Sequence, residues 1–191
     1  MSGSLSKSAN VEPAWVGEVI YFWFEELSEG YWFTKNNGVD AQIRDRFLAL
    51  HKRLLAQNGL GATTPRSMLA AVIVLDQFSR NLFRSDPRAY VADAIARRVS
   101  NSAIEEGFDA AMTKQERRFL YLPFEHSEDA GDQLRSLNLI KTLGNEEWTR
   151  YAMAHKIIID RFGRFPHRNA VLNRPSTPDE IELLKEPMNS F

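Results

Sequence analysis

The chain of 191 residues contains no cysteine. Disulfide bonds, thiolate metal sites and cysteine nucleophiles are therefore excluded for this sequence. A composition without cysteine fits a reducing compartment, and we expect a cytoplasmic location.

The sequence also lacks an excess of positive charge and long apolar runs. Its 24 basic side chains stand against 25 acidic ones, whereas nucleic-acid-binding proteins usually carry a basic excess or face, so we expect no nucleic-acid partner. The apolar run 19–24 is far too short to span a bilayer, and the polar residues 1–10 lack the apolar core of a signal peptide. We therefore expect no membrane association, a flexible tail over residues 1–10, and a single all-helical domain over residues 11–191.

Strand patterns are nearly absent, whereas helical spacing of apolar residues and helix-start signals recur throughout the chain. Thr64 precedes Pro65, Asp86 precedes Pro87, and Thr113 stands three residues before a glutamate, all of which are typical of helix N-termini. Pro123 is expected to break or kink its helix after residue 122. We predict helices over about 13–27, 40–57, 65–79, 87–106, 114–122, 127–143 and 146–161, and a short one from 178. About eight helices with short loops indicate an all-α array or bundle of antiparallel neighbours.

Three polar blocks are not explained by a simple helical bundle. In the first block, residues 75–81, Asp76 lies near an apolar helix face and stands four residues before Arg80. Because buried charges are usually paired, these two side chains are expected either to form an ion pair that anchors the helix end, or to leave Arg80 and Asn81 facing a cavity that binds an anion.

The second block, residues 121–129, gathers acids and a histidine around the proline. Ser127, Glu128 and Asp129 are explained by capping of the next helix, but Glu125 and His126 are less well explained in this way. Irregular backbone often presents functional groups, so Glu125 and His126 are candidate site residues.

The third block, residues 161–169, is a stiff turn rich in hydrogen-bond donors. It holds Arg164, His167, Arg168 and Asn169 beside a glycine and a proline. Arginine donates in a planar fork that suits a carboxylate or a phosphate, and it would suit the acids of the second block equally well.

Two further residues are ambiguous. His155 lies on an apolar helix face, where a hydrogen-bonded core histidine and a ligand-binding histidine are both compatible with the pattern. Trp32 lies between predicted helices and is either a core residue or the wall of an apolar pocket. The histidine spacing matches no metal motif, and phosphate-loop, dinucleotide and serine-hydrolase templates are missing, so we expect neither a metal nor a cofactor.

Three functional hypotheses follow from these blocks. The first is a binding module whose cleft takes a small anionic molecule, with a carboxylate or a phosphate, or a peptide. The second is a metal-independent hydrolase or transferase in which His126 or His167 acts as acid or base beside Glu125. The third is a purely structural or interaction domain in which the blocks brace one another. Nothing in the sequence selects an oligomeric state. The candidate ligand-binding residues are Trp32, Asp76, Arg80, Asn81, Glu125, His126, His155, Arg164, His167, Arg168 and Asn169.

Together with the aromatic residues at 22–24 and 32–33, the three blocks resemble the bacterial "domain of unknown function 924" family. The resemblance covers nearly everything after residue 10, and the third block is its most specific part, whereas Ser79 stands where the family usually has proline. It implies a tetratricopeptide-like array of antiparallel helix pairs. It implies no particular reaction, and fold alone does not define function.

Overall fold

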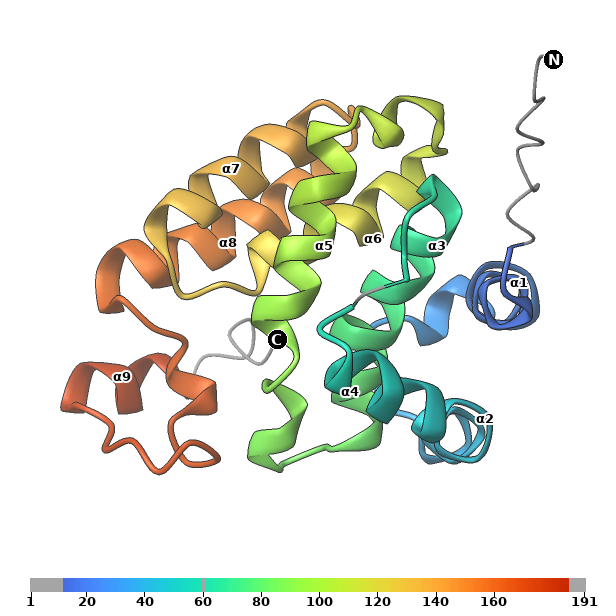
Figure 1. The fold of residues 1–191 in the computed structure, drawn as a ribbon. Coiled ribbons are helices and arrows are strands. Elements are labelled where there is room, and N and C mark those ends of the chain that lie inside the picture. The colour runs from blue at the N-terminus through green and yellow to red at the C-terminus, as the bar shows by residue number, and fades with distance from the viewer. Residues whose placement is uncertain (1–11, 60, 186–191) are drawn as a thin grey trace, which may run out of the picture.

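The computed structural model of the protein describes residues 12–59 and 61–185. Within these ranges the chain forms helices joined by loops and no strand (Figure 1). Because α3 and α4 belong to one continuous helix, the nine labelled α-helices of these ranges make eight helical units. The prediction of an all-α array of about eight helices is confirmed. The tail expected over residues 1–10 lies outside the described residues.

The first two helices carry most of the N-terminal aromatic residues. Helix α1, Ala14–Tyr21, continues directly into a π-helical turn, Phe22–Glu26. Helix α2, Asn37–Ala56, begins earlier than predicted because the Asn36 side chain accepts hydrogen bonds from two backbone amides of its first turn. The buried face of α2 is made by Val39, Ile43, Phe47, Leu50 and Leu54.

The central helix is buried on every face over residues 69–79, as its apolar sequence predicts. It comprises α3, Pro65–Val72, a π-helical segment, Ile73–Phe78, and α4, Ser79–Leu82. Thr64 caps it in a reciprocal capping box. A π-helical segment changes the direction in which the following side chains point, and such segments are frequent at functional sites. The first polar block lies within this part of the helix.

The helix predicted over 87–106 is split in two. A 3-10 turn, Pro87–Ala89, is capped by Asp86, and α5 then runs from Asp93 to Glu105. The split places Asp93 at the start of α5.

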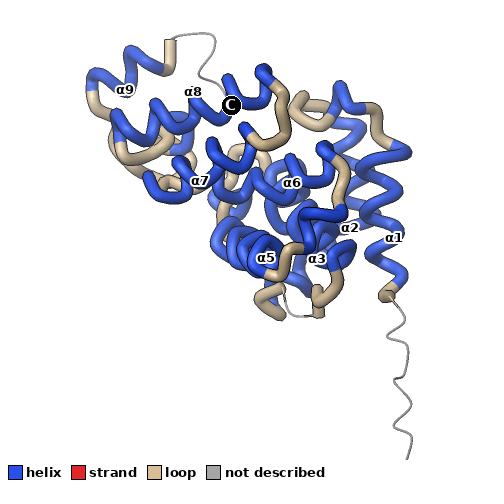
Figure 2. The backbone as a smooth tube through the Cα atoms, turned by 90° about the horizontal axis from the view of Figure 1, so that it is seen from above, coloured by secondary structure: helices blue, strands red, loops and turns tan. Residues whose placement is uncertain are grey.

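The next three helices, α6 (Lys114–Glu125), α7 (Ala130–Lys141) and α8 (Glu146–Phe162), pack side by side (Figures 1 and 2). The predicted capping box of Thr113 with Glu116 is present, and Asn145 caps α8. The prediction that Ser127 caps α7 is wrong, because the Asp129 side chain accepts the amide hydrogen bond of Asp132.

Pro123 does not break α6, contrary to the prediction that the helix would end or kink after residue 122. The helix continues to Glu125, and the amide of His126 still donates to the carbonyl of Leu122 at 2.9 Å. Proline removes only one helical donor, and the buried surroundings of residues 119–125 hold the last turn in place. As a result, Glu125 and His126 are presented by a helix end instead of a loop.

The C-terminal part of the described chain forms a small unit beside α8. Gly163 ends α8 with a φ of 67°, which favours glycine, and a short 3-10 turn, Pro166–Arg168, follows. Helix α9, Pro178–Leu183, closes this part and lies on the opposite side of the molecule from α1 (Figure 2). This C-terminal unit has an apolar cluster of its own around Phe165.

Trp32 belongs to the aromatic core. Its indole nitrogen donates to the carbonyl of Trp23 at 2.8 Å, and its ring lies 4.9 Å from that of Phe119. The core-packing alternative therefore accounts for all of these contacts of Trp32.

No helix in the described ranges has the length and apolar character that crossing a membrane requires.

Candidate functional site

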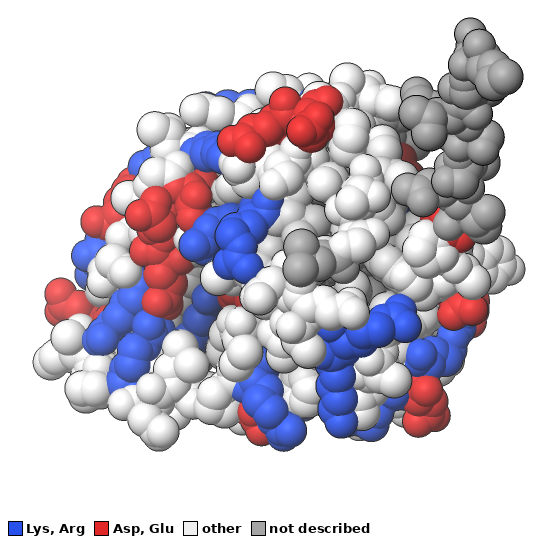
Figure 3. Space-filling model, viewed as in Figure 1, with Lys and Arg blue, Asp and Glu red and all other residues white. Residues whose placement is uncertain are grey.

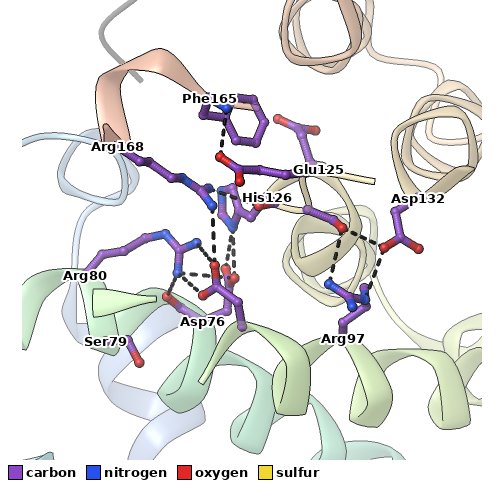
Figure 4. Close-up of polar contacts among 12 residues, drawn as sticks. Asp76, Ser79, Arg80, Arg97, Glu125, His126, Asp132, Phe165 and Arg168 are labelled. Carbon is purple, nitrogen blue, oxygen red and sulfur yellow. Dashed lines mark hydrogen bonds and ion pairs between the residues drawn. The ribbon is translucent and has the colours of Figure 1, made fainter. Parts of the chain in front are cut away.

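Residues of the three polar blocks meet where the central helix, the end of α6 and the turn after α8 come together (Figure 4). The first and second blocks are joined through Asp76 and His126, and the second and third through His126 and Arg168. We name this group the polar cluster. Its members are Asp76, Arg80, Asp93, His126, His167 and Arg168.

Asp76 is the centre of the polar cluster. Its side chain is 1% exposed, and its two carboxylate oxygens lie 2.8 Å and 2.9 Å from Nδ1 of His126. The Gln77 amide donates to the same carboxylate at 2.6 Å. Burial by itself would raise the pKa of Asp76, but the charge of Arg80 and the hydrogen bonds from His126 and Gln77 outweigh it and hold the pKa well below its usual range. Asp76 is therefore ionised at neutral pH.

Arg80 links Asp76 to Asp93. Its Nη1 lies 3.4 Å from Oδ1 of Asp76 and donates to the Asp76 backbone carbonyl at 2.5 Å. Its two terminal nitrogens also donate to both carboxylate oxygens of Asp93, at 3.1 Å and 3.2 Å. The predicted pairing of Asp76 with Arg80 is confirmed, but the bidentate partner of Arg80 is Asp93.

The geometry fixes the neutral form of His126. Because an ionised Asp76 only accepts hydrogen bonds, Nδ1 of His126 carries the proton. Burial, opposed by the charge of Asp76, lowers the pKa of His126, so the ring is neutral at pH 7. Its Nε2 makes no hydrogen bond within the described residues and is not among the buried unpartnered atoms, so it contacts solvent as a free acceptor.

Arg168 is almost enclosed, with a side chain that is 8% exposed. Its Nη2 donates to the backbone carbonyl of His126 at 3.0 Å, and its Nη1 lies 3.7 Å from Asp93. The guanidinium lies between the rings of Tyr90 and Phe165, 4.7 Å and 4.6 Å from their centroids. Its Nε is buried and has no acceptor in the described part of the chain. An unsatisfied donor on a buried cation is costly and invites a functional explanation.

His167 stands next to Arg168 and carries no hydrogen bond to its ring nitrogens from the residues the structure describes. Burial, together with the charges of Arg168 and Arg80, lowers its pKa to about 4. The ring is therefore neutral at physiological pH and packs 5.6 Å from Phe165.

Glu125 and His155 form a second buried pair beside the polar cluster. Burial raises the pKa of Glu125 to about 7, against the opposing charge of Arg118. Burial also lowers the pKa of His155 to about 3, and its Nδ1 donates to the Tyr151 carbonyl at 2.9 Å. The same nitrogen lies 3.4 Å from Glu125. At pH 7 His155 is therefore neutral, and Glu125 is about half protonated.

Two members of the third block point away from the polar cluster. Arg164 pairs with Glu180 through two bonds of 2.6 Å and 2.8 Å. The amide of Asn169 donates to Ser176 and Glu180, and its oxygen accepts from Arg174. These contacts tie the turn to α9. A surface hollow of about 370 Å³ lies there, lined by Arg161, Phe162, Arg164, Thr177, Asp179 and Glu180.

Asn81 and Trp32 also make their contacts elsewhere. The amide of Asn81 donates to Asp40 of α2 at 2.8 Å, and Asp40 pairs with Arg84 as well. Asn81 thus fastens α2 to the central helix, whereas Trp32 packs against Trp23 and Phe119 in the aromatic core. The structure thus brings Asp76, Arg80, His126, His167 and Arg168 together with Glu125 and His155 beside them, and leaves Trp32, Asn81, Arg164 and Asn169 outside.

Sequence reasoning missed Asp93, Tyr90 and Arg174. Asp93 lies inside what was predicted as one continuous helix, and only the split of that helix would have marked it. Arg174 forms two bonds to Glu128, of 2.6 Å and 2.9 Å, and Glu128 in turn accepts the backbone amide of Phe165 at 2.8 Å. No sequence pattern distinguishes Arg174 from a surface arginine.

No group of three or more histidine, aspartate or glutamate side chains in the described ranges is arranged to hold a metal ion. The polar cluster itself holds two aspartates, two arginines and two neutral histidines.

Comparisons with known proteins agree with the fold. A protein-family model described as "Bacterial protein of unknown function (DUF924)" matches residues 19–188. The solved structure of a protein of unknown function from Agrobacterium tumefaciens is similar to this chain, with 37% sequence identity and a TM-score of 0.81. The match covers 89% of this chain and 96% of the other. None of the curated proteins matches.

Proposed function

Because the chain belongs to DUF924, a family of bacterial proteins of unknown function, we propose its function from its geometry: it is a binding module for a small anionic molecule or peptide end, which binds at the polar cluster. The anionic group of the ligand is a carboxylate or a phosphate. The observation that carries the proposal is the buried Nε of Arg168, which has no acceptor among the residues that the structure describes.

Three residues of the polar cluster carry ring or guanidinium nitrogens without a hydrogen-bond partner among the described residues. Arg168 offers Nε–H, the adjacent His167 offers its unbonded ring nitrogens, and His126 offers the lone pair of Nε2. An anionic oxygen on Arg168 and a hydroxyl or amide of the ligand on His126 would satisfy them. The π-helical segment that holds Asp76 supports a functional assignment of this region, because such segments are retained at functional sites at some cost in helix geometry.

Thermal unfolding in the presence of small anions tests the proposal. Inorganic phosphate, acetate, succinate and citrate are compared on the parent and on His167→Asn, which keeps the polar cluster's ion pairs intact. A ligand at about 100 times its Kd adds about 2.7 kcal/mol of stability, which is roughly 5–10 °C in melting temperature for a chain of this size. The His167→Asn and Arg168→Gln variants should lose most of this shift.

Arg88→Gln is the matched control, since Arg88 contacts Asp86 and the Phe83 ring at the surface and lies outside the polar cluster. It should respond to the anion as the parent does. The polar cluster is not a binding site and serves to brace the fold if no anion stabilises the parent. The same conclusion follows if anions raise the melting temperatures of His167→Asn, Arg168→Gln and Arg88→Gln equally.

A second function, metal-independent acid–base catalysis, is favoured by the Asp76–His126 pair. Asp76 orients the ring through Nδ1 and leaves Nε2 as a solvent-facing base, which is the arrangement of a general base with its orienting carboxylate. The nearby Arg168 would stabilise negative charge that develops on a substrate. Hydrolysis of a panel of nitrophenyl carboxylate and phosphate esters tests this. His126→Gln must abolish any turnover and Asp76→Asn must reduce it, and turnover that survives His126→Gln contradicts the catalytic role.

We further propose that the fold is tetratricopeptide-like and that the protein is cytoplasmic. The consecutive packing of α5 with α6, α6 with α7 and α7 with α8 supports a tetratricopeptide-like arrangement of antiparallel helix pairs. The absence of cysteine from the sequence supports a cytoplasmic location.

A further inference from the structure

A separate hollow of about 320 Å³ lies on the surface between α5 and α7, next to the end of α6. None of its lining residues belongs to the polar cluster or to the three predicted blocks except Phe124. Figure 3 shows basic and acidic side chains gathered over this side of the molecule. The hollow is lined by residues that include Arg97, Arg98, Asn101, Phe124, Asp132 and Arg135.

The hollow carries more positive than negative charge. Of its three arginines, Arg97 is neutralised by Asp132, whose Oδ2 lies 3.1 Å from Nε of Arg97. Arg98 and Arg135 have no carboxylate within ion-pair distance among the residues the structure describes. The hollow therefore presents two positive charges that the protein itself does not balance.

Arg135 is held in place for an incoming ligand. Its Nη1 donates to Oδ1 of Asn101 at 2.6 Å, and its guanidinium lies over the Phe124 ring, 4.4 Å from the centroid. These two contacts fix the plane of the guanidinium and use one of its five N–H donors. Since the group is already ordered, little side-chain entropy is lost when a ligand binds.

Arg97 and Arg98 complete the hollow in different ways. Arg97 is fixed by Asp132 and by the Ser127 hydroxyl, to which its Nη1 donates at 3.2 Å. Among the described residues the only hydrogen bond of Arg98 is a long one of 3.5 Å to the Ala94 carbonyl of its own helix, so its guanidinium is available to close over a ligand. The fixed Arg97 and the more mobile Arg98 therefore line the same hollow.

We propose that this hollow, named here the arginine hollow, binds the phosphate group of a small phosphate monoester. Two unbalanced arginines match the two negative charges that such a group carries above its second pKa, whereas a carboxylate would balance only one. The volume lies at the lower end of ligand pockets and accommodates a phosphate with a small organic substituent. The site is distinct from the polar cluster and does not depend on the function proposed for it.

Isothermal titration of the full chain with phenyl phosphate, inorganic phosphate and benzoate tests the assignment. Phenyl phosphate should bind, and benzoate should bind at least tenfold more weakly. Arg135→Gln should weaken phenyl phosphate at least tenfold and Arg98→Gln at least threefold. Arg98→Gln is the decisive variant because Arg98 is exposed and its loss leaves folding intact.

Arg150→Gln is the matched control, since Arg150 is also an exposed helical arginine and lies on α8, outside the hollow. It should bind phenyl phosphate as the parent does. Arg168→Gln separates the two proposals: binding at the arginine hollow survives this variant, whereas binding at the polar cluster does not. The proposal is overturned if phenyl phosphate fails to bind the parent at about 10 mM, if Arg98→Gln binds as the parent does, or if only Arg168→Gln loses binding.

Discussion

Nδ1 of His126 lies 2.8 Å from Oδ1 of Asp76, although 50 residues separate the two in sequence. The contact joins the central helix to the end of α6 and fixes the tautomer of the histidine. Since Asp76 also holds Arg80, one carboxylate orders both side chains. The predictions below begin from this arrangement.

Asp76→Asn should lower the free energy of unfolding by about 3–5 kcal/mol, because it leaves Arg80 partly unbalanced in a buried position. Urea denaturation at pH 7 measures the change. Asp45→Asn, on the exposed face of α2, should change it by no more than about 0.5 kcal/mol. Equal midpoints for the two variants would show that Asp76 contributes nothing to the fold.

Glu125→Gln should stabilise the protein at high pH and much less at low pH. Burial raises the pKa of Glu125 to about 7, so the folded state holds this proton more tightly than the unfolded state does. The free energy of unfolding of the parent therefore falls by on the order of 3 kcal/mol as the pH rises towards 7. The glutamine variant cannot ionise at this position and does not show this fall. Urea denaturation at pH 5 and pH 8 measures it, with exposed Glu105→Gln as the control. A difference that does not depend on pH contradicts the raised pKa.

His155 and His167 should stay neutral well below pH 6. Burial lowers the pKa of His155 to about 3, and burial with neighbouring arginines lowers that of His167 to about 4. Because both groups bind protons more readily when unfolded, their contribution to stability is complete above about pH 6.5 and is lost as the pH falls below it. Long-range proton–nitrogen NMR spectra recorded from pH 7.5 to 4.5 measure the ring nitrogens directly. Titration of either ring near pH 6.5 would contradict the burial of that histidine.

Glu128→Ala should loosen the turn that carries His167 and Arg168. Glu128 accepts the Phe165 amide at 2.8 Å and forms two bonds to Arg174. Removing it strands a backbone donor and a partly buried cation, which should cost about 2 kcal/mol. Hydrogen exchange at the Phe165 amide should become at least about tenfold faster. Glu182→Ala, which removes only an exposed pair with Lys185, should leave that exchange rate unchanged.

Several helix boundaries were predictable because their signals are local. The Thr113–Glu116 capping box, the Asn145 cap of α8 and the Thr177 start of α9 all involve residues within three positions of one another. Such contacts form within a single turn, so the sequence alone specifies them. The positions of α5 and α6 were predicted less well, because Asp86 starts only a 3-10 turn and because burial carries α6 past Pro123.

The composition of the polar cluster was partly predictable, and its bonds were not. The three blocks stood out because buried or clustered charges need partners, and that rule applies to the sequence. Which partner each charge takes depends on how the helices pack, so Asp93 for Arg80, Arg174 for Glu128 and Glu180 for Arg164 were found only in the structure.

The sequence by itself therefore determined most of the helices, several of their caps and most of the polar residues in need of partners, because these follow from spacing within one helix. The tertiary structure alone decided that Asp76 meets His126, that Arg168 keeps a buried nitrogen without an acceptor, and that Arg98 and Arg135 share a hollow with one carboxylate. These relationships depend on the relative placement of helices far apart in the chain, and that placement is set by packing over the whole core.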